Sequence, residues 1–439
     1  MDNHLKRSIG LGSALSIIVG TIIGSGIFFK QASVLDSAGS TFMALLAWIL
    51  AGIITLTAGL TIAEIGAQMP YTGGLYVYIE KIYGRVLGFM AGWMQAIVYG
   101  PAMIAAVTGF LSIMVTNLFG IGTEWRIPIG LITIIAIGGL NFLENKVGAA
   151  FAIITTIAKM IPIFAIIFCG ICWGEQNAVA QTVTELNRST GGLGVAVLAA
   201  LFAYDGWIFI ANLGGEIKNP QKLLPKAIII GITTVLVIYA LITIGIFSFI
   251  PADKIHALGQ NSTTYLADAI LGPIGGKVLS VGIIISMLGT LNGEMLTIYA
   301  MAKRGDLPFS RFLSYVTPKG KAPVMATMLL IALTGIMMTF FDPDYLSNLC
   351  VFTIYSFYVL AFFGLFILRY KNKDQRPFSV PFYPLIPLVA IAGGLFVLVS
   401  QFFNDPAGVL LFTGITAVGW PIFFLVKKMS KAQNTIIED

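Results

Sequence analysis

Charged side chains are scarce in this sequence. Asp, Glu, Lys and Arg make up 10% of the 439 residues, against about 25% in a soluble globular protein. Hydrophobic residues reach 57%, and the mean hydropathy is +0.90. A soluble fold cannot hide so much apolar surface, because too few polar residues remain to cover it. The composition therefore excludes a soluble enzyme or binding domain and indicates an integral membrane protein.

Histidine and cysteine, which supply nucleophiles and metal ligands, are also rare. The two histidines are His4, near the amino terminus, and His256, in a predicted loop, and neither lies beside a carboxylate or cysteine cluster. Three scattered cysteines, Cys169, Cys172 and Cys350, lie in apolar stretches. They form neither a disulfide framework nor a zinc ligand set, so we expect small buried side chains there. We expect no enzymatic activity, no metal and no cofactor.

Apolar runs of about 18 residues or more predict twelve membrane-spanning helices in one polytopic domain. The first run lacks a small-residue cleavage site, so we expect it to be retained rather than removed as a signal peptide. The twelve predicted spans cover 9–34, 40–69, 85–116, 126–142, 148–173, 192–215, 225–250, 272–301, 323–341, 344–368, 383–403 and 406–426.

Lys and Arg are distributed unevenly between the two sides of these spans. Of the 26 basic residues, 20 lie in the two termini and the even-numbered loops, and five, including Lys30, lie on the other side. The positive-inside rule then predicts that both termini are cytoplasmic. The net charge of +6 does not indicate nucleic-acid binding, because the basic residues do not gather on one face.

Two spans carry residues that interrupt a helix. Span one contains three glycines in seven residues, Gly20, Gly24 and Gly26, which lower its helix propensity. Span six contains Asp205 followed by Gly206 at mid-depth, which is costly in lipid unless the backbone opens toward a cavity. Close packing of helices through small residues also explains such glycines. The pairing of the two motifs favours two broken helices.

The two interrupted spans are each the first of a group of five. Because five is odd, the second group starts from the opposite side of the membrane, so the groups are predicted to be inverted repeats. Repeat one covers 9–173, repeat two covers 192–368, and 383–426 contributes two extra helices. Paired interruptions at matching positions indicate the central site of a transporter.

Broken helices in mid-membrane offer opposite charges to a ligand. Amides that open a second half-helix attract an anion, and carbonyls that end a first half-helix attract a cation. The two breaks together predict a receptor for a zwitterionic amino acid, although the Asp205 side chain has an alternative role as an N-cap. The predicted carboxylate contacts are Gly24, Ser25, Gly26 and Ile27, and the predicted ammonium contacts are the carbonyls of Ile22, Phe202, Ala203 and Asp205.

Lys159 lies in the middle of predicted span five. It is eleven residues from either predicted end, and so about 16 Å from each interface, too far to reach water by extending its side chain. Its ammonium must be paired or neutralised, either as a fixed ionic contact or in a functional role. A fixed ammonium also substitutes for a bound sodium ion, with carbonyls near Gly20 as candidate partners.

Other polar side chains within the spans add candidates with open alternatives. Ser286 and Thr290 share a face of span eight and either offer oxygens to the same site or bond back to their own helix. Tyr239 needs a partner for its hydroxyl or serves in packing alone. Glu64 and Glu294 lie within spans two and eight, as proton sites, partners of other groups or solvated residues.

Four motifs resemble one known group of proteins. They are GTIIGSGIF at 20–28, TIAEIGAQMPYTGGLYVYIEKIYG at 61–84, LFAYDGW at 201–207 and GEIKNPQKLLPKAI at 215–228. Across essentially the whole chain the sequence resembles the amino acid, polyamine and organocation (APC) superfamily. Within it, the chain is most similar to the L-type amino acid transporter family, especially the bacterial serine/threonine and alanine-serine-cysteine exchangers.

The resemblance implies an all-α, LeuT-like fold of ten core helices plus two. It implies sodium-independent exchange of small neutral L-amino acids such as alanine, serine, threonine and cysteine across the cell membrane, by analogy a bacterial cytoplasmic membrane. It places the substrate carboxylate on Ser25, Gly26 and their neighbours, the amino group on the carbonyls of Phe202, Ala203 and Asp205, a gate at the Phe202 ring, and a sodium substitute at Lys159.

Partners and competing activities follow from the same resemblance. Animal members pair with a glycoprotein through a cysteine after span three, but 117–125 contains none, so no disulfide-linked heavy subunit is expected. A proton-coupled amino acid symporter of the same fold is the alternative function. A channel fits less well, because paired broken helices predict a site that can be occluded.

Overall fold

The chain folds as a bundle of helices. The computed structural model describes residues 7, 9–71, 73–140, 160–184, 192–293, 297–316, 323–371 and 376–438. Within those ranges regular structure is helical, and β pairing is limited to two isolated bridges, Ile9 with Ile217 and Ser40 with Thr182. An all-helical chain of this hydropathy satisfies its backbone hydrogen bonds inside each segment, as lipid requires.

Seven helical segments in the described part of the chain are long and apolar enough to cross a membrane, or eight if the bent first pair counts as one span. These seven are α3 (Thr41–Gln68), Arg85–Phe119, α11 (Pro220–Phe249), Gly272–Leu291 within α13 (Ser262–Gly293), α17 (Pro343–Lys371), α18 (Leu385–Asn404) and Pro406–Lys428, which joins α19 (Pro406–Ala417) to α20 (Gly419–Glu438). Shorter apolar helices are Met160–Trp173, α9 (Gly192–Tyr204) and α16 (Val324–Phe340). Helices occupy most of the described parts of the predicted spans, with 192–215 interrupted after Tyr204. Residues 141–142, 148–159 and 294–296 of those spans lie outside the described residues.

The first predicted span is interrupted where its glycines are. Helix α1 (Leu11–Ile22) ends before Gly24, helix α2 (Gly26–Ala38) begins two residues later, and the two are bent by 46°. The sixth span is interrupted as well. Helix α9 ends at Tyr204, Gly206 adopts a left-handed conformation (φ 98°), and the short helix α10 (Phe209–Asn212) follows.

The predicted span 85–116 is continuous but not uniform. It consists of α5 (Arg85–Trp93), a π-helical turn η1 (Met94–Tyr99) and α6 (Gly100–Phe119). Pro101 is the second residue after the π turn. A proline has no amide hydrogen and its ring clashes with the carbonyl four residues earlier, so a wider turn relieves the contact at this point.

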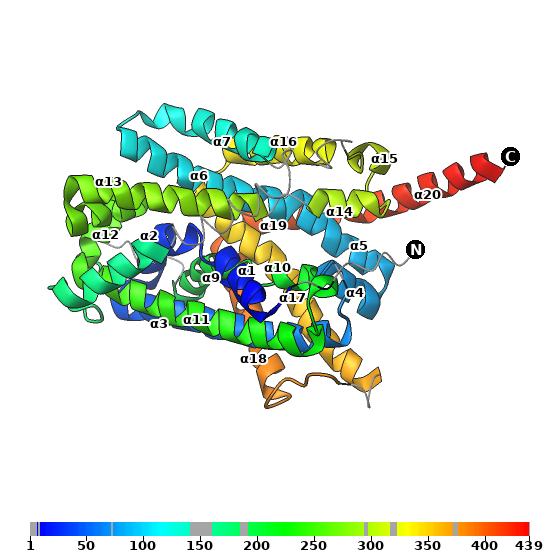
Figure 1. Ribbon diagram of the computed structural model, residues 1–439, viewed down its shortest axis with the longest axis horizontal. Helices are drawn as coiled ribbons and strands as arrows, with labels where there is room; N and C mark the ends of the chain where they lie inside the picture. Colours follow the sequence, from blue (N-terminus) through cyan, green and yellow to red (C-terminus); the bar gives the residue numbers. More distant parts are fainter. Residues whose placement is uncertain are drawn as a thin grey trace.

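The interrupted segments lie at the centre of the bundle (Figure 1). Helices α3 and α11 pack together along one side of α1 and α9, whereas α6, α7 (Arg126–Leu140), α13 and α16 form the opposite side. Helix α17 crosses between them, with α18 beyond it, and α20 projects from the bundle. Large buried side chains, among them Trp48, Trp207 and Tyr239, fill the interior around the breaks.

Short helices close the ends of the bundle. After α11 the chain forms α12 (Ala252–Leu258) and a 3-10 turn η4 (Gly259–Asn261), both packed beside α2. Near the other ends of the long helices lie α4 (Leu75–Tyr83) and α14 (Thr297–Lys303). His256 of α12 contacts Asp36 of α2, Gln260 of η4 contacts Asp344 of α17, and Glu80 of α4 pairs with Arg304.

Candidate functional site: the crossing of two broken helices

The two helix breaks lie directly against each other. The Thr21 hydroxyl, at the end of α1, donates a hydrogen bond to the Gly206 carbonyl at 3.2 Å. On the other side, a Cβ atom at Gly26 would lie 2.5 Å from the Ala203 Cα, so only glycine permits this approach of α2 to α9. Two segments separated by some 180 residues therefore form one site.

The start of α2 presents backbone amides inside the protein. The Phe28 amide donates back to the Ser25 carbonyl at 3.1 Å, whereas Gly26 and Ile27 are the first two residues of the helix, whose amides have no carbonyl in a preceding turn. Ser25 is 2% exposed, and Gly26 and Ile27 are buried. The positive end of the α2 dipole thus lies in a dry environment, where it favours an anion.

Helix α13 contributes a hydroxyl to the first break. A Cβ atom at Gly24 would lie 3.0 Å from the Thr290 Oγ1, which places Thr290 against the break. Thr290 also donates to the Ser286 carbonyl at 3.3 Å, as the back-bonding alternative requires. The Ser286 hydroxyl is buried and has no hydrogen-bond partner among the described residues. Thr290 therefore lies against the first break, and Ser286 lies one helical turn away from Thr290.

Tyr239, in α11, connects the two breaks. Its hydroxyl lies 3.1 Å from the Ile22 carbonyl and 2.9 Å from the Ala203 carbonyl. These are two of the carbonyls expected to face an ammonium. The hydroxyl carries one proton, which it donates to one of these carbonyls or shares between them. Each carbonyl oxygen has two lone pairs, so at least one remains on each. The hydroxyl of Tyr239 thus has partners, and packing alone does not explain this residue.

Asp205 does not cap the second half of span six. The N-cap of α10 is Ile208, which has no side-chain cap, and the expected contact from Asp205 is not formed. Its Oδ2 instead accepts a hydrogen bond of 2.5 Å from the Tyr99 hydroxyl, and its Oδ1 is buried without a partner in the described part of the chain. The turn at Gly206 separates Asp205 from α10, so the carboxylate points toward the π turn of η1 rather than toward the next helix.

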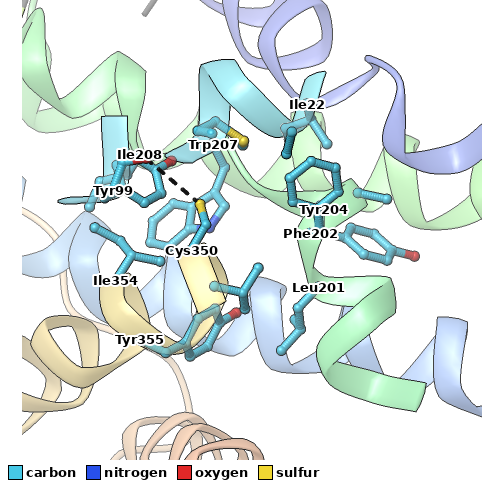
Figure 2. Packing of buried hydrophobic residues seen from close by; sticks show 14 of the residues in the cluster. Ile22, Tyr99, Leu201, Phe202, Tyr204, Trp207, Ile208, Cys350, Ile354 and Tyr355 are labelled. Carbon is cyan, nitrogen blue, oxygen red and sulfur yellow. Dashed lines mark hydrogen bonds between the residues drawn. The ribbon is translucent and has the colours of Figure 1, made fainter. Parts of the chain in front are cut away.

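Tyr99 and its neighbours were not predicted from the sequence. Tyr99 ends the π turn, and its carbonyl lies 4.0 Å from the Cys350 Sγ in α17. Figure 2 shows Tyr99 on one side of Trp207, with Ile22 and Phe202 on the other. Pro101, in the middle of an apolar run, was the signal for an irregular turn here.

The Phe202 side chain packs toward α6, beside the second break. It is 3% exposed, and its ring lies 6.2 Å from that of Phe110, which stacks on Phe29 at 5.0 Å. These three aromatic side chains come from α9, α6 and α2. The sequence placed Phe202 at the site, whereas its partners could be identified only from the packing.

Four residues named from the sequence remain: Lys159, Glu294, Gly20 and Glu64. Lys159 and Glu294 lie outside the described residues, and Gly20 lies in α1, four residues before the break. Glu64, by contrast, is paired. Its carboxylate accepts two hydrogen bonds from Arg369, with Nε–Oε1 at 2.7 Å and Nη2–Oε2 at 2.5 Å. Of the three roles open for Glu64, the structure supports that of a partner for another charged group.

A comparison with known protein families matches nearly the whole chain. The amino acid permease family profile covers residues 9–426. This chain belongs to the amino acid permease family. The family includes transporters of the APC superfamily, in agreement with the resemblance carried by the glycine and Asp-Gly motifs.

Individual permeases are similar over the same length. The serine/threonine exchanger SteT of Bacillus subtilis is 46% identical over 97% of this chain and 98% of its own. The human cystine/glutamate transporter is 30% identical over 96% of this chain and 85% of its own, and the mouse Asc-type amino acid transporter 1 is 30% identical over 96% and 81%. These relatives are transporters and exchangers, and the chain is not an enzyme.

Proposed function

We propose that this permease is an antiporter that exchanges small neutral L-amino acids, such as serine, threonine, alanine and cysteine, across a cell membrane by alternating access. The observation that carries the proposal is the crossing of two broken helices, with buried amides at one break and carbonyls at the other. The serine/threonine exchanger at 46% identity supports exchange as the reaction and small amino acids as the substrates.

The substrate carboxylate binds at the start of α2. Gly24, Ser25, Gly26 and Ile27 supply backbone amides and one hydroxyl, and the helix dipole adds a favourable field. Burial strengthens these hydrogen bonds, because water does not compete for them. Thr290 lies against Gly24 and is suited to orient the substrate or the break itself.

The substrate ammonium binds among the carbonyls at the ends of α1 and α9. Tyr239 holds the carbonyls of Ile22 and Ala203 toward one point, and their second lone pairs accept from the ammonium. The carbonyls of Phe202 and Asp205 complete this set. Aromatic and aliphatic side chains surround the remaining space, so a neutral side chain is accommodated at lower cost than a charged one.

The proposal also covers the membrane topology, the independence from sodium and the subunit composition of the transporter. The chain forms twelve spans, with 9–173 and 192–368 as inverted repeats, 383–426 as extra helices, and both termini in the cytoplasm. Lys159 takes the place of a sodium ion near Gly20 and Ser286, which makes transport independent of sodium. The permease works without a disulfide-linked heavy subunit.

The test is uptake of radiolabelled serine by liposomes that contain the purified protein. We expect uptake only when unlabelled serine is present inside, with no dependence on sodium or on an inward proton gradient. Uptake into empty liposomes driven by the gradient would identify a proton symporter instead. An absence of uptake under all conditions would contradict the substrate assignment.

Two glycines of the first span provide a matched test of the site. Gly26→Ala places a methyl group where no space exists beside Ala203, and overpacking of this kind costs about 1–3 kcal/mol. Gly12 is exposed in α1, and a methyl group added there would have no neighbouring atom within 4 Å. We expect Gly26→Ala to abolish serine exchange and Gly12→Ala to preserve it. Equal activity of the two variants would contradict the assignment of the break as the substrate site.

A further inference from the structure

A groove on the outside of the bundle is lined by apolar residues alone. It has a volume of about 810 Å³ and lies between α16, the short helix α15 (Ser310–Leu313) and the segment where α5 passes into η1. All ten of its lining residues are apolar, and they include Trp93, Ile97, Phe309, Phe312, Met325 and Met328. None of the ten belongs to α1, α2, α9 or α10. The groove is therefore separate from the crossing of the two broken helices.

The chain has an unusual backbone conformation where α15 borders the groove. Phe309 has a φ of 58°, in the left-handed region that bulky residues rarely occupy. The Ser310 hydroxyl holds this turn, because it donates to the Leu307 carbonyl and accepts from the Leu307 amide at 3.1 Å. Phe309 is 75% exposed and Phe312 is 58% exposed. Such strain persists only where the surrounding structure maintains it, and it is frequent at ligand sites.

Basic side chains are concentrated in the loop that borders the groove. The predicted loop 302–322 contains five Lys and Arg residues, more than any other predicted loop, and a single acidic residue, Asp306. Arg304 is engaged in ion pairs, whereas Lys303 and Arg311 are exposed. The distribution of basic residues predicts that this side is cytoplasmic, where anionic phospholipids attract exposed Lys and Arg. An apolar groove thus lies beside an excess of positive charge.

We propose that the groove binds an anionic phospholipid of the cytoplasmic leaflet, with one acyl chain against α16 and the headgroup phosphate on Arg311. The volume lies within the range of about 300–1,000 Å³ that is typical of sites for small molecules. An acyl chain desolvates no polar side chain in such a lining, so its burial carries no polar cost. A guanidinium can bind a phosphate through two parallel hydrogen bonds.

The groove extends to a segment that contacts the substrate site. Ile97 lines the groove and belongs to the π turn η1. The same turn ends at Tyr99, whose hydroxyl donates to Asp205 beside the second break. A bound acyl chain therefore packs against the turn that carries Tyr99.

The experiment titrates the purified, delipidated permease in detergent with phosphatidylglycerol or with phosphatidylcholine that carries the same acyl chains. Native mass spectrometry measures the dissociation constant of the first bound lipid. We expect phosphatidylglycerol to bind at least about tenfold more tightly, because each nearby basic residue favours an anionic headgroup by about fivefold. Oleate, which has a negative charge and an acyl chain but no phosphate, should bind more weakly than phosphatidylglycerol.

Two variants with matched controls locate the bound lipid. Met328→Trp fills the groove and should weaken phosphatidylglycerol binding at least about tenfold. Its control is Met43→Trp, the same change at an exposed methionine of α3. Arg311→Gln should weaken phosphatidylglycerol binding about fivefold and leave phosphatidylcholine binding unchanged. Its control is Arg7→Gln, the same change at an exposed arginine near the amino terminus, and both controls should bind as the wild type does.

Three results would overturn the proposal. Equal affinities of the wild type for the two phospholipids would show that the basic loop selects no headgroup. Unchanged affinity in both groove variants would place the lipid elsewhere, and oleate binding as tight as that of phosphatidylglycerol would identify a fatty-acid site instead. Arg311 is exposed, so Arg311→Gln tests the site even if Met328→Trp does not fold. Because the titration requires no transported substrate, its outcome is independent of the serine exchange assay.

Discussion

The two ends of α17 each carry a buried ion pair, and the two pairs differ in construction. At its last turn, Arg369 binds Glu64 of α3 through two parallel hydrogen bonds. The Val380 amide donates to the same carboxylate at 2.6 Å, and the Tyr383 ring lies 3.7 Å from the guanidinium carbon. Side-chain exposure is 10% for Arg369 and 0% for Glu64.

At the first turn of α17, Lys30 binds the Asp344 carboxylate through one oxygen at 2.6 Å, and the Asp344 backbone carbonyl lies at 3.4 Å. The Asp344 side chain is 23% exposed, and its other partners are side chains from separate segments. A guanidinium fits a carboxylate in one planar geometry. An ammonium is a compact point charge and can bind a carboxylate in many geometries. Burial alone therefore does not define the role of an ion pair. The pair at the last turn has the geometry of a fixed contact, and the pair at the first turn has the geometry of a contact that can break and form again.

The largest expected effect comes from breaking the pair at the last turn. Arg369→Met leaves Glu64 buried without its main partner, and such a loss typically costs about 3–5 kcal/mol. We expect strongly reduced thermal stability of the purified protein in detergent and little folded material. Lys427→Met, which removes an exposed lysine in α20, serves as the control. A variant as stable as the control would show that this pair is not a structural contact.

A smaller loss of stability is expected at the first turn. After Lys30→Met, Asp344 still accepts hydrogen bonds from Ser33 and Gln260 and is partly hydrated, so we expect a cost of about 1–3 kcal/mol. The thermal midpoint should fall less than that of Arg369→Met under the same conditions. The reverse order of the two midpoints would contradict the distinction between a fixed and a separable pair.

The smallest loss of stability is expected at Arg304, the most exposed of the three basic residues compared. Arg304 lies 2.5 Å from Glu80 of α4 and 3.2 Å from Asp306, and its side chain is 36% exposed. Burial raises the pKa of the Asp306 carboxyl, while Arg304 and Arg85 oppose that rise. Arg304→Gln should cost less than about 1 kcal/mol, and added salt should reduce the difference from wild type. A cost equal to that of Lys30→Met would mean that exposure does not rank these contacts.

The sequence predicts those features that depend on local chemistry. Three glycines in span one and an Asp-Gly pair in span six are sufficient to locate both breaks, because helix propensity is a property of the residues themselves. Long apolar runs likewise predict the helices of the described chain, although their bounds extend differently: α17, expected at 344–368, covers Pro343–Lys371. Family motifs then add the substrate class.

Contacts between distant segments could not be predicted in the same way. Lys30 and Asp344 are 314 residues apart, and Tyr99 and Asp205 are 106 apart, so no local pattern links them. The alternative role of Asp205 as an N-cap is not realised, because the turn at Gly206 separates this carboxylate from α10. Of the thiols, Cys169 and Cys350 are buried as expected, but Cys172 is exposed.

Hydrogen exchange of the wild-type permease tests the contrast between the two ends of α17 most directly. The measurement compares amide exchange with and without saturating serine in three segments: α2, the first turns of α17 around Asp344, and its last turns around Arg369. Exchange reports opening over minutes to hours. We predict that serine changes protection in α2 and in the first turns of α17 and leaves the last turns unchanged. Equal changes at both ends of α17, or a change confined to the Arg369 end, would contradict the account.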